Sequence, residues 1–339
     1  MKKITVLTPS RIHIALLDLN GSIGRVDGGI GLTLSDPGFK IVAHVSDRTE
    51  ISGNNEILSR AKEIVSILQR KCNIGHVKVE IERAIPSHVG LGSGTQLSLG
   101  IAQALCKLYG LNYSHQEMAY LVERGGTSGI GVAAFSHGGF IVDGGHSLQD
   151  KPSFLPSSAS KGVKPPPIIA RYNFPDWDIL ITIPKCKHIS GEEEVKLFQT
   201  LCPIPLDDVK TIAHLVLLKL MPAIVQRDIV SFSEAINKIQ SIGWKKVEIE
   251  KQDAIIRETM DFLRHNGGYG VGLSSWGPAI FCFGENLKPL ELKTKEFLSE
   301  GYCFITKANN TGAIIIEEDI NGIYGDRPET ADLQEALHR

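Results

Sequence analysis

The 339-residue sequence lacks the features that mark several classes of protein. It has 36 Lys and Arg against 38 Asp and Glu, so no excess of one charge would recruit nucleic acid or an anionic membrane. The longest apolar helical run, near 212–221, carries His214 and Lys219 and is too short and polar to span a bilayer. The N-terminus has no charged stretch before an apolar segment, so we expect a cytoplasmic protein without a signal peptide.

Paired cysteines and clustered histidines are also missing. The six cysteines, at 72, 106, 186, 202, 282 and 303, contain no CxxC pair. This spacing excludes a disulfide framework and a zinc finger, and the histidines show neither HxH nor HExxH spacing. We therefore expect mostly reduced cysteines in the core and no zinc site.

Glycine, by contrast, is abundant, with 34 residues in the chain. Average usage is about 7%, and the surplus lies in four short clusters, at 25–31, 90–94, 125–139 and 267–277. Clusters of this kind are typical of loops in which the backbone approaches a ligand closely. We expect the four loops to converge on one anion.

The length predicts about two domains, and the hydrophobic patterns predict the α+β class. The expected strands cover 3–7, 40–45, 77–83, 178–183, 279–283, 302–306 and 313–316. The expected helices cover 57–68, 96–108, 115–123, 208–221, 231–241, 249–265 and 288–299, the third opened by a capping box from Ser114 to Glu117. A proline- and serine-rich crossing at 150–167 separates an N-terminal domain (1–165) from a C-terminal domain (166–325), and a polar tail follows at 326–339.

The most specific motif is the run from Pro86 to Thr95, which lies between an expected strand and an expected helix. A glycine loop at a helix N-terminus binds phosphate, because its free N–H groups point at the anion. The loop is neither a Walker A motif nor a GxGxxG fingerprint. The alternative is a tight turn with a glycine-rich helix N-terminus.

Three segments resemble motifs of the GHMP small-molecule kinase superfamily, in the same order along the chain. They are Thr8–His13, Pro86–Thr95 and Gly270–Ala279. The resemblance implies an N-terminal domain like ribosomal protein S5 domain 2 and a ferredoxin-like C-terminal domain.

One position departs from the kinase pattern. The kinases carry Ser-Gly-x-Asp, with the Asp serving as base or orienting the attacking hydroxyl, whereas here the run is Ser128-Gly129-Ile130-Gly131. Glycine has no side chain to take a proton. Although phosphoryl transfer depends mostly on positioning and electrostatics, Gly131 disfavours a kinase.

A narrower resemblance accounts for this departure. The runs 25–31, 126–132 and 138–146 look like those of the β-ribofuranosylaminobenzene 5′-phosphate synthases, an archaeal family with the kinase-like fold. The resemblance implies a pentosyltransferase of methanopterin biosynthesis that joins phosphoribosyl pyrophosphate to 4-aminobenzoate and releases CO2 and pyrophosphate. It also implies a homodimer and a Mg²⁺ cofactor.

The resemblance and the residue types suggest roles for the polar residues of these motifs. The expected catalytic residues are Arg25, Asp27, Asp18 and His13. The pyrophosphate is expected on Gly90, Leu91, Gly92, Ser93, Gly94, Thr95, Arg124 and Ser128. Further substrate contacts are expected from Arg11, Asp143, Gly272, Ser274 and Trp276, and Mg²⁺ ligation from Ser93 and Glu123.

Structural alternatives stay open for these residues. Each charged residue could instead form an ion pair that tethers a loop, Glu123 could be a surface carboxylate, and Trp276 could pack in the core. Two alternative functions also remain, an ATP-dependent kinase of a small alcohol and a non-catalytic phosphate sensor. The many carboxylates among the glycines disfavour the sensor.

Overall fold

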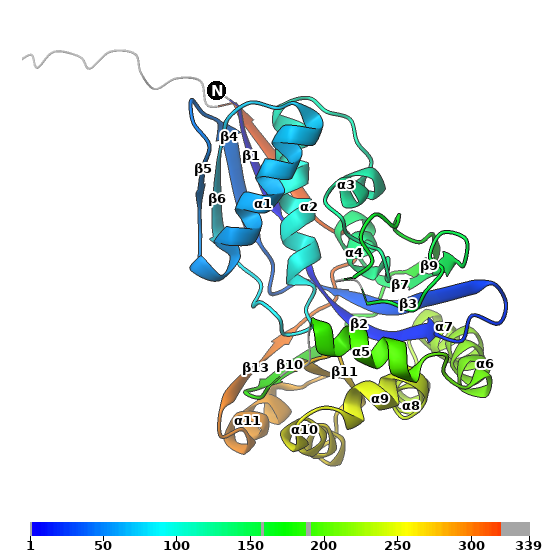
Figure 1. Cartoon of the computed structure of the whole chain (residues 1–339). Coiled ribbons are helices and arrows are strands. Elements are labelled where there is room, and N and C mark those ends of the chain that lie inside the picture. Colours follow the sequence, from blue (N-terminus) through cyan, green and yellow to red (C-terminus); the bar gives the residue numbers. More distant parts are fainter. Residues whose placement is uncertain (1, 157–158, 188–190, 320–339) are drawn as a thin grey trace, which may run out of the picture.

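The computed structural model describes residues 2–156, 159–187 and 191–319, and within these residues the chain forms three helix-covered β-sheets (Figure 1). Helices and strands both contribute to each part of the molecule, so the predicted α+β class is confirmed. The tail predicted at 326–339 lies outside the described residues.

The first sheet joins the two ends of the described chain, in the strand order β14-β1-β4-β6-β5. Its strands are β14 (Ile314–Asp319), β1 (Lys2–Leu7), β4 (Lys40–Val45), β6 (Val77–Arg83) and β5 (Glu50–Ser52). Two helices, α1 (Asn55–Cys72) and α2 (Ser93–Leu108), lie side by side and cover one face (Figure 1). The apolar residues that predicted α1 are those it buries, including Ile57, Ile64 and Leu68.

The second sheet lies between the first sheet and the C-terminal half of the chain (Figure 1). It has the order β2-β3-β7-β9, formed by Ser10–Asp18, Arg25–Leu34, Phe140–Asp143 and Ile168–Tyr172, and the short β8 (His146–Ser147) also pairs with β3. Helix α4 (Ile130–His137) packs on this sheet, and α3 (His115–Leu121) packs on α2 and α4. The predicted capping box at the start of α3 is present.

The third sheet, in the order β11-β12-β10-β13, is formed by Tyr269–Leu273, Ile280–Gly284, Asp178–Pro184 and Gly301–Thr306. The helices packed on it are α8 (Ile229–Gln240), α10 (Ala254–His265) and α11 (Lys288–Phe297). The remaining elements of this half are α5 (Glu192–Leu201), α6 (Leu206–Leu215), the π-helix η1 (Val216–Leu220), α7 (Met221–Gln226) and α9 (Gly243–Glu250).

Several expected elements differ from the observed ones. The helix expected over 249–265 is two helices, because the backbone of Asp253, with ψ of 152°, is not helical and separates α9 from α10. The helix expected over 208–221 contains a π-helical turn and continues to Gln226. The strand expected at 313–316 is present, but it pairs with β1 of the first sheet and not with the strands of the C-terminal half.

The first glycine cluster lies in strand β3, so its expected loop is a wrong prediction. Glycine is required there by packing: a Cβ on Gly31 would lie 2.3 Å from Cγ2 of Ile130, and a Cβ on Gly29 would lie 2.9 Å from Oδ2 of Asp143. Part of the 267–277 cluster is likewise the strand β11. These glycines let α4 and its preceding loop approach the second sheet.

All six cysteines lie among the described residues and none forms a disulfide, as predicted. Cys106, Cys282 and Cys303 are buried, whereas the other three are only partly buried, so half of the cysteines and not most of them lie in the core. Among the helices of the described residues, none is long and apolar enough to cross a membrane.

Candidate active site

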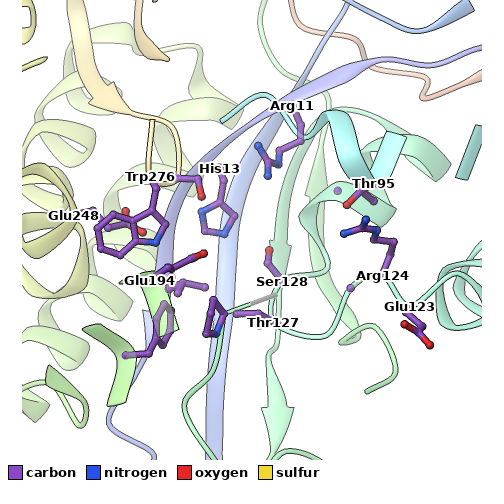
Figure 2. A pocket seen from close by; sticks show the side chains of 16 residues that line it. Arg11, His13, Thr95, Glu123, Arg124, Thr127, Ser128, Glu194, Glu248 and Trp276 are labelled. Carbon is purple, nitrogen blue, oxygen red and sulfur yellow. The ribbon is translucent and has the colours of Figure 1, made fainter. Parts of the chain in front are cut away.

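A cavity of about 230 Å³ opens between β2, the start of α2 and α4, helices α5 and α9, and the loop after β11 (Figure 2). Its walls are formed by Arg11, His13, Leu16, Thr95, Glu123, Arg124, Gly125, Thr127, Ser128, Gly131, Pro156, Glu194, Phe198, Glu248, Ser275 and Trp276. Seven residues expected from the sequence therefore meet here: Arg11, His13, Thr95, Glu123, Arg124, Ser128 and Trp276.

The first turn of α2 reaches this cavity through Thr95, whereas the other expected residues of the glycine loop do not line it: Gly90, Leu91, Gly92, Ser93 and Gly94. Gly92 precedes the first residue of the helix in a left-handed conformation, with φ of 80°, and a Cβ there would lie 3.1 Å from Cγ of Arg11. The first-turn N–H groups of a helix have no intrahelical partner and carry the positive end of its dipole. The start of α2 beside Arg11 therefore fits a phosphate group.

Three arginines surround this helix start. The Arg11 guanidinium donates to the carbonyl of Gly90, and burial lowers its pKa to about 10. The Arg124 Nε donates to Ser98 Oγ at 3.3 Å, and its side chain lines the cavity (Figure 2). The Arg60 guanidinium lies against Gly94, where a Cβ would come within 2.9 Å of its Nη1. At neutral pH all three remain cationic. Arg11 and Arg124 line the cavity and make this wall positive, whereas Arg60 lies outside the lining.

Arg60 was missed by the sequence analysis. It lies in the middle of α1, next to buried Ala61, and no motif marks it. Only the packing of α1 against α2 brings its guanidinium to the glycine loop.

Of the two expected metal ligands, Glu123 lines the cavity and Ser93 does not. Ser93 is the first residue of α2, whereas Glu123 has a left-handed backbone and forms an ion pair with Lys161 at 3.4 Å. Within the described ranges, no group of three or more His, Cys, Asp or Glu residues could hold a metal ion. Mg²⁺ binding stays a prediction.

His13 projects into the cavity from β2 (Figure 2). Burial, followed by the charges of Arg11 and Lys245, lowers its pKa well below 6.5, so the ring is neutral at pH 7. Its backbone N–H donates to Ser274 Oγ at 3.0 Å, and that hydroxyl donates to the Gly90 carbonyl at 2.7 Å. Ser274 therefore ties β2, the glycine loop and the C-terminal half together. Ser274 and the expected Gly272 do not line the cavity.

The opposite wall is aromatic and acidic. Phe198 and Trp276 both pack on buried Trp244, with ring centroids 4.4 and 5.9 Å from it. Glu194 and Glu248 lie beside them (Figure 2). Of these residues only Trp276 was expected from the sequence, because α5 and α9 carry no recognisable motif.

Asp27 lies behind the cavity and not in its wall. Its carboxylate is fully buried and accepts from Lys151 Nζ at 3.0 and 3.1 Å, and it lies 2.7 Å from Nδ1 of His146. Lys151 also donates to Thr127 Oγ1 at 2.9 Å, and Thr127 does line the cavity. This geometry is the loop-tethering ion pair that was the alternative for Asp27, and the sequence analysis missed its partner Lys151.

Three other expected residues also stand outside the wall. Asp143 is fully buried and accepts from the Gly129 N–H at 2.9 Å and from Ser128 Oγ at 3.2 Å, so it holds the loop that starts α4. Asp18 accepts from two N–H groups of the turn that follows it. Arg25 donates to the carbonyls of residues 144 and 145. These contacts support the site from outside.

Gly131, where the kinase pattern has Asp, does line the cavity. A Cβ on this residue would lie 3.1 Å from Cγ2 of Thr95, so the Thr95 side chain occupies the adjoining space. The carbonyl of Gly131 accepts from Nε2 of Gln96 at 2.8 Å, which fixes α4 against α2.

Comparison with known proteins agrees with this architecture. Residues 59–139 match the GHMP kinases N terminal domain and residues 220–301 match the GHMP kinases C terminal domain. A homoserine kinase from Cytophaga hutchinsonii superposes with a TM-score of 0.63 at 15% identity, covering 93% of this chain and 97% of its own. A mevalonate kinase superposes with a TM-score of 0.63 at 16% identity, covering 90% and 99%. The fold is therefore that of the GHMP kinase superfamily.

Two curated relatives define the family within this superfamily more narrowly. The β-ribofuranosylphenol 5′-phosphate synthase of Archaeoglobus fulgidus is 45% identical over 313 residues, covering 91% of this chain and 98% of the relative. The enzyme of the same name from Methanocaldococcus jannaschii is 46% identical over 326 residues, with the same coverage. The chain belongs to the family of the β-ribofuranosylphenol 5′-phosphate synthases.

Proposed function

We propose that this chain is a decarboxylating pentosyltransferase that joins phosphoribosyl pyrophosphate to a para-substituted benzoate and releases CO2 and pyrophosphate. The observation that carries the proposal is a single cavity with an arginine wall and an aromatic wall, in a member of this family. The arginine wall suits the anionic donor, and the aromatic wall suits a benzoate ring.

The acceptor has two candidates that differ in one group. The motifs favour 4-aminobenzoate, which would give β-ribofuranosylaminobenzene 5′-phosphate for methanopterin biosynthesis. The name of the relatives specifies a ribofuranosylphenol, and the same chemistry makes that product from 4-hydroxybenzoate. Both acceptors carry a carboxylate and an electron-donating para group.

In the proposed reaction, the C1–O bond of the ribose breaks and its electron pair leaves with pyrophosphate. Arg11, Arg124 and the first-turn amides of α2 stabilise the charge that develops on this leaving group. The aromatic carbon that bears the carboxylate then attacks the cationic ribose carbon. Loss of CO2 returns the electron pair to the ring, so this step needs no base.

The reaction explains how the site can function with Gly131 in place of the kinase aspartate. A kinase must orient or deprotonate an alcohol, whereas a carbon nucleophile that loses CO2 has no such proton. Mg²⁺ would add positive charge at the pyrophosphate, and we propose Ser93 and Glu123 as its nearest protein oxygens. A homodimer is likewise proposed from the family resemblance.

The direct test incubates the protein with Mg²⁺, phosphoribosyl pyrophosphate and either carboxyl-labelled benzoate, and in parallel with ATP and a panel of alcohols. Release of labelled CO2 that requires the ribosyl donor supports the proposal. Alcohol-dependent formation of ADP without CO2 would support the kinase instead. If the protein binds phosphoribosyl pyrophosphate but turns over neither mixture, it is the phosphate sensor.

A further inference from the structure

The aromatic wall holds a carboxyl group with no basic partner. Of its two glutamates, Glu248 pairs with Lys245, whereas no Lys, Arg or His nitrogen in the described part of the chain lies within 4 Å of the Glu194 carboxylate. Burial, helped by the charge of Glu248, raises the pKa of Glu194 to about 7, while a hydrogen bond from Trp276 opposes the shift. A partly buried carboxyl that lines a cavity and has no cationic partner there suggests a bound group that donates a hydrogen bond to it.

The surroundings of Glu194 are suited to a flat ring. Leu16, Phe198 and Trp276 line the cavity and belong to one apolar cluster with Trp244. Phe198 and Trp276 are held by their packing on Trp244, which is 1% exposed. The arginines lie at the other end, beside Thr95 and the start of α2 (Figure 2). An aromatic acid can therefore bind with its carboxylate toward the arginines and its far end toward Glu194.

We propose that Glu194 recognises the para substituent of the acceptor by accepting a hydrogen bond from its O–H or N–H group. This inference rests on the proposed function. The carbon that attacks the ribose bears the carboxylate, and the para carbon is on the opposite side of the ring. When the reacting carbon faces the ribosyl donor at the arginine wall, the para group points at the aromatic wall.

The contact also contributes to the chemistry. When the ring carbon bonds to the ribose, the ring loses an electron pair and positive charge develops on the para oxygen or nitrogen. A carboxylate that holds the O–H or N–H hydrogen stabilises this charge more than it stabilises the neutral acceptor. When the bond to CO2 breaks, its electron pair restores the aromatic ring and the para group keeps its hydrogen. No external oxidant or base is required.

The proposal defines the acceptor class as benzoates with a hydrogen-donating para group. It therefore predicts that 4-methoxybenzoate, which has a para oxygen but no hydrogen on it, is a poor acceptor. Both 4-hydroxybenzoate and 4-aminobenzoate belong to the class, and their relative rates depend on which group fits the space beside Glu194.

The test uses the 339-residue protein and the variant Glu194→Gln, with Glu193→Gln as the matched control. Glu193 is exposed in the first turn of the same helix, so its variant keeps the helix and changes charge equally. Labelled CO2 release is measured with each of the three benzoates at saturating ribosyl donor. We expect Glu194→Gln to lower kcat/KM for the hydroxyl and amino acceptors about 10- to 100-fold, to leave the KM for the ribosyl donor unchanged, and to reduce discrimination against the methoxy analogue.

A pH profile separates this role from a structural one. The groups facing Glu194 are Glu248 of α9, which is paired with Lys245, His13 of β2 and the Trp276 indole. Because the ionised carboxylate accepts the hydrogen bond, kcat/KM for the acceptor should fall as the pH drops below about 7. Glu194→Gln should abolish this fall in kcat/KM at low pH (the acid limb of the profile), and Glu193→Gln should retain it. Thermal unfolding of all three proteins verifies that they are folded.

The outcomes separate the two proposals. A folded Glu194→Gln enzyme with wild-type preference among the three benzoates and a wild-type acid limb would overturn the role of Glu194 and leave the proposed function intact. A wild-type enzyme that releases no CO2 from any benzoate would overturn both. Loss of activity in Glu193→Gln equal to that in Glu194→Gln would also contradict a specific role for Glu194.

Discussion

Lys151 Nζ lies 3.0 Å from Oδ2 of Asp27, and both side chains are buried, with exposed fractions of 2% and 0%. Lys151 comes from the proline-rich crossing between the two halves of the chain, and Asp27 comes from β3. The pair therefore fastens that crossing to the second sheet, directly behind Thr127 of the cavity wall.

Breaking this pair should destabilise the whole protein. Lys151→Met leaves the Asp27 carboxylate buried with His146 as its remaining partner, and removing one member of a buried pair costs about 3–5 kcal/mol. Urea unfolding measures this loss. The control Lys161→Met removes an exposed ion pair with Glu123 and should cost less than about 1 kcal/mol. Equal stability of the two variants would show that the buried pair does not hold the crossing.

Arg60 should bind the ribosyl donor although it lies outside every recognised motif. Arg60→Gln removes a positive charge beside Gly94 of the phosphate loop, and the loss of one charge-assisted contact should raise the KM for phosphoribosyl pyrophosphate about 10-fold or more. The KM for the benzoate should change little. Arg70→Gln, an exposed substitution in the last turn of the same helix, should behave as wild type. A wild-type donor KM in Arg60→Gln would exclude Arg60 from the site.

Placing an aspartate at residue 131, as in the kinase pattern, should not give the protein kinase activity. In Gly131→Asp the new side chain meets Thr95, whose Cγ2 would be 3.1 Å from its Cβ, and it adds negative charge near the donor's phosphates. We expect donor affinity to fall about 10-fold and no ADP formation from ATP with any alcohol. Direct titration with phosphoribosyl pyrophosphate measures the first effect. Tighter donor binding, or alcohol-dependent ADP, would contradict the proposed position of the pyrophosphate.

Asp143 should make stability depend on pH. Burial raises its pKa to about 7, against three hydrogen bonds that lower it. Between about pH 4 and pH 7 the folded state therefore binds the proton that the unfolded state has lost, so the free energy of unfolding falls as the pH rises and levels off above pH 7. Over this pH range the free energy of unfolding should fall by on the order of 4 kcal/mol because of Asp143. Asp143→Asn should flatten this slope in urea unfolding, and an unchanged slope would exclude Asp143 as its source.

Much of the fold could be predicted because its patterns are local. The apolar spacing of α1 and the capping box of α3 each involve residues of a single helix. They can therefore be recognised without knowledge of the rest of the chain. The pairing of β14 with β1 joins residues more than 300 positions apart in the sequence. Neither strand has a sequence feature from which its partner strand could be predicted. For the same reason the expected assignment of 313–316 to the C-terminal half is wrong.

The site was predictable where a motif carries it. Thr95, Arg11 and His13 lie within motifs, and the structure brings their side chains to one cavity. Helix and loop packing alone brings Glu194 into the cavity wall, Arg60 against Gly94 and Lys151 against Thr127, and no short-range spacing marks these three residues. Asp27 and Arg25 lie in a recognised run, but a run of residues does not distinguish a side chain that faces a substrate from one that supports a loop.

The measurement that tests the account most directly is the product balance of one reaction. Phosphoribosyl pyrophosphate is mixed with carboxyl-labelled 4-hydroxybenzoate or 4-aminobenzoate and Mg²⁺, and CO2 and pyrophosphate are counted together. The account predicts one CO2 for each pyrophosphate, with neither formed when the ribosyl donor is omitted. Pyrophosphate without CO2, or no product from folded protein, would contradict it.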